Sequence, residues 1–193
     1  MIEIPQNYQN KLSNINFIDL FSGIGGFRLA LSSFGAKCVF SIDNDKHASK
    51  IYDNNFNSSS FGDITEIDEK EIPPHDILCA GFPCQAFSIS GKQLGFNDTR
   101  GTLFFDILRI VNYHKPKIIF LENVNNLKRH DNGNTYKTIR NLLNKEGYNI
   151  YSEILNASKF GIPQSRKRIY IVCIRKDIDN HKFHFSKENR NAL

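Results

Sequence analysis

The sequence lacks several features that would place it in a specialised class of protein. Its 193 residues include no Trp, one Met and four Cys, and no apolar run approaches the roughly 18 residues that a membrane span requires. The Cys are far apart, with neither a C-x-x-C pair nor clustered His, so we expect no disulfide framework and no metal site. The first residues also lack the basic and apolar stretches of a secretory signal. These absences indicate a cytosolic protein without a membrane segment.

The composition is that of an ordinary globular protein, with 40% hydrophobic and 23% charged residues. A chain of this length predicts one domain that folds without a disulfide or metal. The charge, however, is uneven. Residues 159–193 carry nine Lys and Arg against three acids, whereas residues 43–76 carry nine acids against three bases. A basic end of this kind can bind a polyanion, although a solvated basic tail is the alternative.

Apolar runs and helical periodicities alternate along the chain. We expect strands at 15–20, 37–42, 76–80, 117–122, 148–155 and 168–174, and helices at 27–34, 45–55, 102–114 and 134–146. The stretch 85–101 is rich in Ser, Gly, Asn and Asp and is expected to be a long loop, of a kind that is usually functional or mobile. Because the strands are apolar throughout and alternate with helices, the sequence predicts an α/β fold with a largely parallel sheet flanked by helices.

A glycine-rich turn follows the first expected strand, over Asp19–Gly26. Backbone amides at such a strand-to-helix turn face the ligand crevice of an α/β sheet. A dinucleotide fingerprint would need Gly where the chain has Arg28, so a ligand without pyrophosphate fits better. Asp43, after the second strand, is placed to bind ribose hydroxyls, and Asp63 and Ile64 to touch an adenine. The alternatives are a tight turn without a ligand and, for Asp43, a helix N-cap.

A cysteine follows the third expected strand, in Gly81-Phe82-Pro83-Cys84-Gln85. Isolated cysteines are usually buried filler, but Cys84 lies on a polar loop at the ligand edge of the sheet, unlike Cys38 and Cys173. No His is close in sequence, so a protease-like Cys–His pair is not indicated. The position of Cys84 therefore favours a functional role over that of buried filler.

Charged residues also lie at two later strand ends. Glu122 follows the apolar run KIIFL and is expected to face the same crevice, where apolar walls can raise a carboxyl pKa and make it a proton donor. The alternative is a surface carboxylate that caps the next helix. Arg166, Lys167 and Arg168 precede the last strand and suit phosphate or base contacts, with a solvated basic turn as the alternative.

The order of these motifs is more specific than any one of them. The series FIDLFSGIGGFRLAL, SIDND, GDI, AGFPCQAFSISGKQLGF, LENV and QSRKRIYIV resembles the DNA (cytosine-5)-methyltransferases of bacterial restriction–modification systems, from about residue 15 to 175. The resemblance implies a Rossmann-like fold that depends on S-adenosylmethionine. It also implies an enzyme of the bacterial cytosol that methylates carbon 5 of a cytosine flipped out of double-stranded DNA.

The resemblance assigns roles to individual positions. It makes Cys84 the nucleophile and places Glu122 at cytosine nitrogen 3, Arg168 near the cytosine carbonyl, and Arg166 beside the nucleophile and a phosphate. It implies a cofactor pocket formed by Phe21, Gly23, Gly25, Gly26, Asp43, Asp63, Ile64, Pro83 and Leu103. It also implies a loop over about 83–102 that closes on DNA, with contacts from Gln85, Ser88, Ser90 and Lys92.

The sequence departs from the family in two places. Asn44 stands where an aromatic residue stacks on adenine, which predicts weaker cofactor binding. Nothing before Leu193 matches the family's target-recognition region, so we expect an N-terminal lead (1–14), a catalytic domain (15–175) and a truncated extension (176–193). A second subunit carrying the missing region is one interpretation and a truncated gene product is another. An inactive remnant that binds cofactor or DNA, and a tRNA cytosine-5 methyltransferase, stay open as alternatives.

Overall fold

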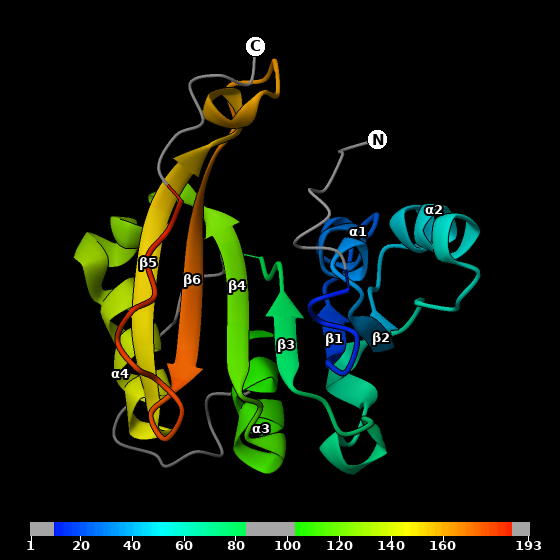
Figure 1. Cartoon of the computed structure of the whole chain (residues 1–193), viewed down its shortest axis with the longest axis horizontal. Coiled ribbons are helices and arrows are strands. Elements are labelled where there is room, and N and C mark those ends of the chain that lie inside the picture. The colour runs from blue at the N-terminus through cyan, green and yellow to red at the C-terminus, as the bar shows by residue number, and fades with distance from the viewer. Residues whose placement is uncertain (1–9, 84–102, 187–193) are drawn as a thin grey trace. The chain divides into compact units, whose positions relative to one another are not determined.

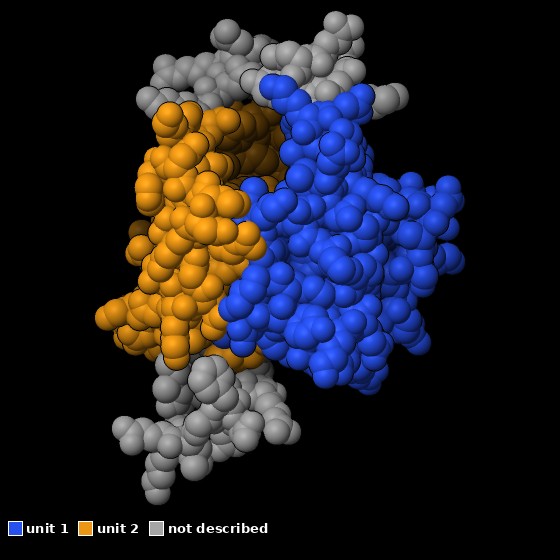
Figure 2. Space-filling view, turned by 60° about the horizontal axis from the view of Figure 1, so that its bottom comes forward, with its two compact units in different colours: residues 1–81, 106–118 blue, residues 82–105, 119–193 orange. Residues whose placement is uncertain are grey.

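The computed structural model describes residues 10–83 and 103–186, in which strands alternate with helices (Figure 1). The chain divides into two compact units, which are coloured in Figure 2. Unit 1 comprises residues 1–81 and 106–118, and unit 2 comprises residues 82–105 and 119–193. Within the described ranges, no helix is both long enough and apolar enough to span a bilayer.

Unit 1 is built on three parallel strands in the order β2-β1-β3. Phe17, Ile18 and Leu20 of the central strand are fully buried, as expected for a strand covered on both faces. The elements of this part of the chain are β1 (Asn16–Leu20), α1 (Gly26–Ser33), β2 (Lys37–Ile42), α2 (Lys46–Phe56), the short 3-10 helices η2 (Ile64–Glu66) and η3 (Glu69–Glu71), β3 (Ile77–Ala80) and α3 (Leu103–His114).

Unit 2 is built on the strand order β4-β6-β5. The neighbours β5 and β6 are antiparallel, from the pair Tyr148–Arg175 to the pair Asn156–Lys167, and Figure 1 shows β6 running opposite to β4 as well. Helix α4 buries Ile139 and Leu143. The elements are β4 (Ile118–Val124), η4 (Asn125–Lys128), η5 (His130–Gly133), α4 (Asn134–Lys145), β5 (Tyr148–Asn156), η6 (Ala157–Phe160) and β6 (Lys167–Arg175).

The expected α/β class with mostly parallel strands is confirmed, and each expected strand or helix lies within two residues of an observed one. The 3-10 helices were not predicted. They are three or four residues long, too short for a periodic pattern, and η2 and η3 each begin at an Asp side chain that accepts a backbone N–H. Helix α1 also differs from expectation, because none of its residues is buried. The expected loop 85–101 lies outside the described residues.

Candidate cofactor turn and catalytic pair

The turn after β1 has a backbone that only particular residues tolerate. Gly25 adopts φ +95°, and a Cβ there would overlap the ring of Phe56. Phe21 adopts φ +54°, an unfavourable conformation for a residue with a side chain, which costs on the order of 1–3 kcal/mol. At Gly23 and Gly26, by contrast, a Cβ would meet no atom of the described residues within 4 Å. The turn therefore holds a strained backbone beside open space, which is typical of a ligand site.

Asp43 ties this turn to the loop after β2. Its Oδ2 accepts a hydrogen bond from the Gly23 N–H at 2.8 Å, and its Oδ1 accepts one from the Asp45 N–H at 2.8 Å. The N-cap of α2 is Asp45, whose side chain accepts the His47 N–H at 2.8 Å. The alternative interpretation of Asp43 as the helix N-cap is therefore wrong. Each Asp43 oxygen keeps a second lone pair for a ligand hydroxyl.

The third expected cofactor loop is held by an arginine that the sequence did not single out. Asp63 Oδ1 accepts the backbone N–H and the hydroxyl of Thr65 at 2.9 and 2.8 Å, and these bonds lower the pKa of the Asp63 carboxyl. The side chain of Ile64 is buried. Arg109 donates to the Ile64 carbonyl at 2.6 Å and pairs with Glu69 at 3.0 Å, so the loop is anchored from α3.

A buried carboxyl lies just before the turn. Asp19 is fully buried within β1, and neither of its oxygens has a hydrogen-bond partner among the described residues. Burial raises its pKa to about 8, which the nearby Arg28 amide and guanidinium only partly offset. The guanidinium of Arg28 donates to the Ser58 hydroxyl at 2.8 Å and lies over the Phe56 ring. The sequence signal that could have indicated this buried carboxyl is a single Asp within the apolar run FIDL.

In unit 2, two of the expected catalytic side chains meet. The Arg168 Nε lies 2.9 Å from the Glu122 Oε1, and about a fifth of each side chain is exposed. Glu122 does not cap the following η4, because the N-cap residue of that turn is Val124. Arg166 and Lys167 are exposed. The solvated-turn interpretation therefore fits these two cations and is wrong for Arg168.

The remaining expected positions divide between described and undescribed residues. Pro83 is exposed and Leu103 is partly buried, whereas Cys84, Gln85, Ser88, Ser90 and Lys92 lie outside the described residues. The three described cysteines are free, and burial raises the pKa of the thiol in each of them, Cys38, Cys79 and Cys173. A raised pKa disfavours the nucleophilic thiolate, so none of the three is a candidate nucleophile. Over residues 10–83 and 103–186, no cluster of His, Cys, Asp or Glu could hold a metal ion.

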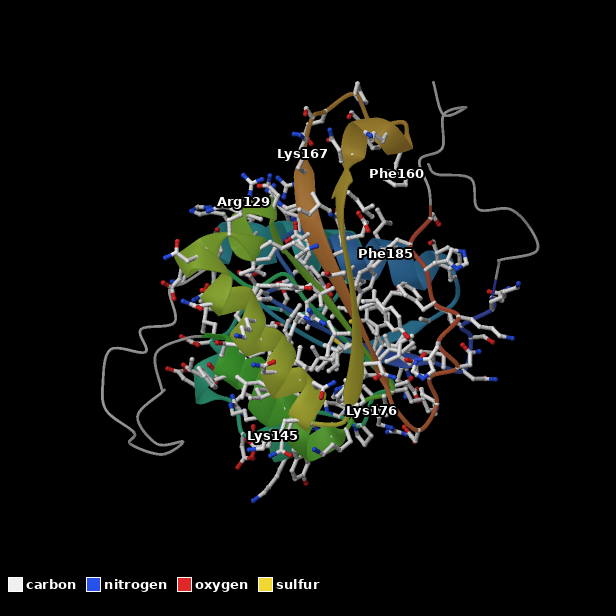
Figure 3. The ribbon with its side chains drawn as sticks, turned by 90° about the vertical axis from the view of Figure 1, so that its left-hand side faces the viewer. Arg129, Lys145, Phe160, Lys167, Lys176 and Phe185 are labelled. Carbon is white, nitrogen blue, oxygen red and sulfur yellow. The ribbon has the colours of Figure 1, made fainter. Side chains whose placement is uncertain are left out.

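A cavity of about 1040 Å³ lies along β5 in unit 2, beside residues 184–186. Figure 3 shows Phe160 and Lys167 near one end of β5 and β6, and Phe185 farther along β5. Lys159, Lys167 and His184 line the cavity together with the rings of Phe160 and Phe185. Basic groups and rings in one hollow suit an anionic or aromatic partner.

The chain resembles known methyltransferases in sequence and in structure. A family model for the C-5 cytosine-specific DNA methylases matches residues 15–192. The type II methyltransferase M.HhaI of Haemophilus parahaemolyticus is 56% identical over 97% of this chain, and M.HaeII of Haemophilus aegyptius is 56% identical over 88%. The Entamoeba histolytica methyltransferase EhMeth superposes with a TM-score of 0.71 at 31% identity, covering 90% of this chain and 56% of that one.

The coverage is unequal between the chain and its relatives. The chain spans about half the length of the curated relatives that it matches, 56% of M.HhaI and 52% of M.HaeII. The part of this chain that the family model matches, residues 15–192, includes the glycine turn, the Asp43 and Asp63 loops and the Glu122–Arg168 pair. The chain belongs to the C-5 cytosine-specific DNA methylase family.

Proposed function

We propose that this chain carries the S-adenosylmethionine-binding and cysteine-nucleophile part of a DNA cytosine-5 methyltransferase of the restriction–modification type, acting in the cytosol. The observation that carries the proposal is the 2.9 Å pair of Glu122 and Arg168 in a member of this family. A carboxyl beside a guanidinium matches the edge of cytosine, because the carboxyl can bind the N3 and N4 groups while the guanidinium donates to the O2 carbonyl.

The turn after β1 fits the cofactor. The open space beside Gly23 and Gly26 leaves room for a ligand close to the backbone, and the Asp43 carboxylate can accept hydrogen bonds from two ribose hydroxyls. Phe21, Asp63, Ile64 and the further positions Gly25, Pro83 and Leu103 complete the proposed pocket. Because Ile64 is buried, we expect its backbone rather than its side chain to meet the adenine.

The chemistry explains why a cysteine is needed. Carbon 5 of cytosine is a weak nucleophile, and bound S-adenosylmethionine supplies a methyl group on a cationic sulfur. When the Cys84 thiolate adds to carbon 6, an S–C bond forms and electron density moves to carbon 5, which then takes the methyl group. Loss of the carbon 5 proton and cleavage of the S–C bond regenerate the aromatic ring and the thiolate. Glu122 stabilises charge on the ring during addition, a contribution of about 3 kcal/mol.

Charge supports double-stranded DNA as the partner. The described residues of unit 2 carry twelve Lys and Arg against six Asp and Glu, whereas those of unit 1 carry nine against eleven. The exposed cations include Arg166, proposed to contact a phosphate. In the undescribed loop, Gln85, Ser88, Ser90 and Lys92 are proposed to contact the flipped base and its strand, which offsets the few kcal/mol that flipping costs.

The relatives are about twice as long, so we propose that target reading requires a further region, present either in the same chain or in a second subunit. The cavity along β5 supports this view, because rings and cations line a hollow that a partner segment can fill. Without that region, base-specific groove contacts are not expected from this chain. For the chain itself, we propose the division expected from the sequence into a lead (1–14), a catalytic domain (15–175) and an extension (176–193).

Methyl transfer from labelled S-adenosylmethionine to DNA tests the proposal. We expect transfer to cytosine when the chain is mixed with the C-terminal half of a relative such as M.HhaI, and little sequence-specific transfer without it. Cys84→Ser is expected to abolish transfer, with cofactor binding by calorimetry as the control that should persist. Transfer that survives Cys84→Ser, or a folded chain that does not bind S-adenosylmethionine, would contradict the proposal.

A further inference from the structure

Asn123 is a buried polar residue next to Glu122 for which neither the sequence nor the chemistry above provides a role. Its side chain is 2% exposed. Its Nδ2 donates to the Phe82 carbonyl at 2.8 Å, and its Oδ1 accepts the Val124 N–H at 2.8 Å. The Asn123 amide therefore links the end of β4 to the backbone two residues before Cys84.

Phe82 is also held through its ring. Its side chain is 5% exposed, and the ring centroid lies 5.8 Å from that of Phe104 in a tilted arrangement. Phe104 lies in the first turn of α3 and is 1% exposed. Both residues belong to unit 2, so this ring contact is made within that unit. The ring contact fixes the position of Phe82, and the Asn123 bond fixes the direction of its carbonyl.

We propose that Asn123 is a positioning residue for the methyl-transfer reaction, acting through the Phe82 carbonyl on the backbone that leads to Cys84. The inference rests on the proposed function. A peptide is planar, so a fixed Phe82 carbonyl also fixes the plane of the Phe82–Pro83 peptide, which includes the Pro83 nitrogen and Cα, one residue before Cys84. A misplacement of about 1 Å at a reacting group can cost about 100-fold in rate.

The two hydrogen bonds of Asn123 predict different consequences and can be separated. Asn123→Asp keeps an oxygen that accepts the Val124 N–H but replaces the donor that faces the Phe82 carbonyl. At pH 8 we expect kcat for methyl transfer to fall about 100-fold while KM for S-adenosylmethionine changes less than about 3-fold. As the pH is lowered, activity relative to the parent should recover, because a protonated carboxyl can donate to the carbonyl.

A matched pair of alanine variants controls for lost hydrogen bonding. Asn149 in β5 donates its Nδ2 to Asp179 at 2.7 Å, so Asn149→Ala also removes an asparagine bond within unit 2. We expect Asn123→Ala to lower kcat about 100-fold and Asn149→Ala to leave it within about 2-fold, both measured with the complementing half and corrected for folded fraction. Full activity of Asn123→Asp at pH 8, or an equal loss in Asn149→Ala, would overturn the inference.

Cys84 alkylation distinguishes failure of this inference from failure of the proposed function. In a Cys38→Ser background, Cys84 is expected to react fastest with iodoacetamide, because Cys79 and Cys173 are buried. We expect Asn123→Ala to change that rate several-fold and Asn149→Ala to leave it unchanged. An altered rate in a chain that does not methylate DNA even with the complementing half supports the coupling of Asn123 to Cys84 and contradicts the proposed function. An unaltered rate refutes the positioning role, whatever the activity.

Discussion

Replacing Asp19 by Asn should stabilise this protein at neutral and alkaline pH. Asp19 is fully buried in β1 without a hydrogen-bond partner among the described residues, and burial raises its pKa from the ordinary 3.8 to about 8. The fold therefore favours the protonated carboxyl. Its contribution to stability is complete below the unfolded pKa of about 4 and is lost progressively as the pH rises through 8.

The size of the effect follows from the two pKa values. Each pKa unit corresponds to 1.36 kcal/mol, so ionisation of Asp19 inside the fold costs about 6 kcal/mol more than in the unfolded chain. At pH 7 the unfolded Asp19 is ionised and the folded one largely protonated, which leaves a penalty of about 4 kcal/mol. An amide removes that penalty but buries an additional N–H group, at about 1–2 kcal/mol. We expect a net stabilisation of about 2–3 kcal/mol at pH 7.

Urea unfolding of the parent and of Asp19→Asn at intervals from pH 5 to 9 measures this difference. The free energy of unfolding of the variant, relative to that of the parent, should rise with pH across that range and level off above pH 8. Asp76→Asn is the matched control with the opposite sign, because Lys117, 2.8 Å away, lowers the pKa of Asp76. Its loss should stay constant from pH 5 to 9 and fade only as the pH falls below the unfolded pKa of about 4. A difference for Asp19→Asn that does not vary with pH would refute the reasoning.

Three further predictions concern single residues. Burial lowers the pKa of His75 from 6.5 to about 4, so the contribution of His75 to stability should fall by about 3 kcal/mol as the pH drops from 6.5 to 4. Acid unfolding of the parent and of His75→Gln in parallel should show that difference. Gly25→Ala should destabilise by about 2–4 kcal/mol through overlap with Phe56, whereas Gly26→Ala, facing open space, should leave the unfolding midpoint nearly unchanged. Arg168→Lys should weaken cytosine binding about 10-fold, because Lys lacks the planar fork, and unchanged binding would contradict the proposed contact.

The sequence predicts the elements well where hydrophobic pattern alone decides them. β2 begins and ends as expected at Lys37 and Ile42, and α4 begins as expected at Asn134. Residues 38–42 of β2 are all at least partly buried and α4 is amphipathic, so the hydrophobic pattern indicates one kind of element in each. The turns η2 to η6 are too short for a periodicity, and side-chain caps such as that of Asp63 define η2 and η3 instead.

The contacts in the site were harder to predict because they depend on distant parts of the chain. By sequence, Asp43 and Asp45 are equally good N-cap residues for α2. Asp45 caps the helix, whereas the Asp43 carboxylate accepts a hydrogen bond from the Gly23 N–H in the turn after β1. Glu122 and Arg168 are 46 positions apart in the printed sequence. They meet because β6 lies between β4 and β5 in the sheet, although it follows β5 in the chain. No local pattern in the sequence specifies this strand order.

In both units, a polar side chain near the end of one strand holds the backbone of a loop that is proposed to belong to the site. In unit 1, Asp43 follows β2 and its carboxylate holds the Gly23 N–H in the loop after β1. In unit 2, Asn123 near the end of β4 holds the Phe82 carbonyl in the loop after β3. Each side chain bonds a backbone group, so its effect does not depend on which residue occupies the held position. The loops proposed to form the site are thus held by polar residues at the ends of strands, and substitutions there should impair the proposed reaction more than they impair folding.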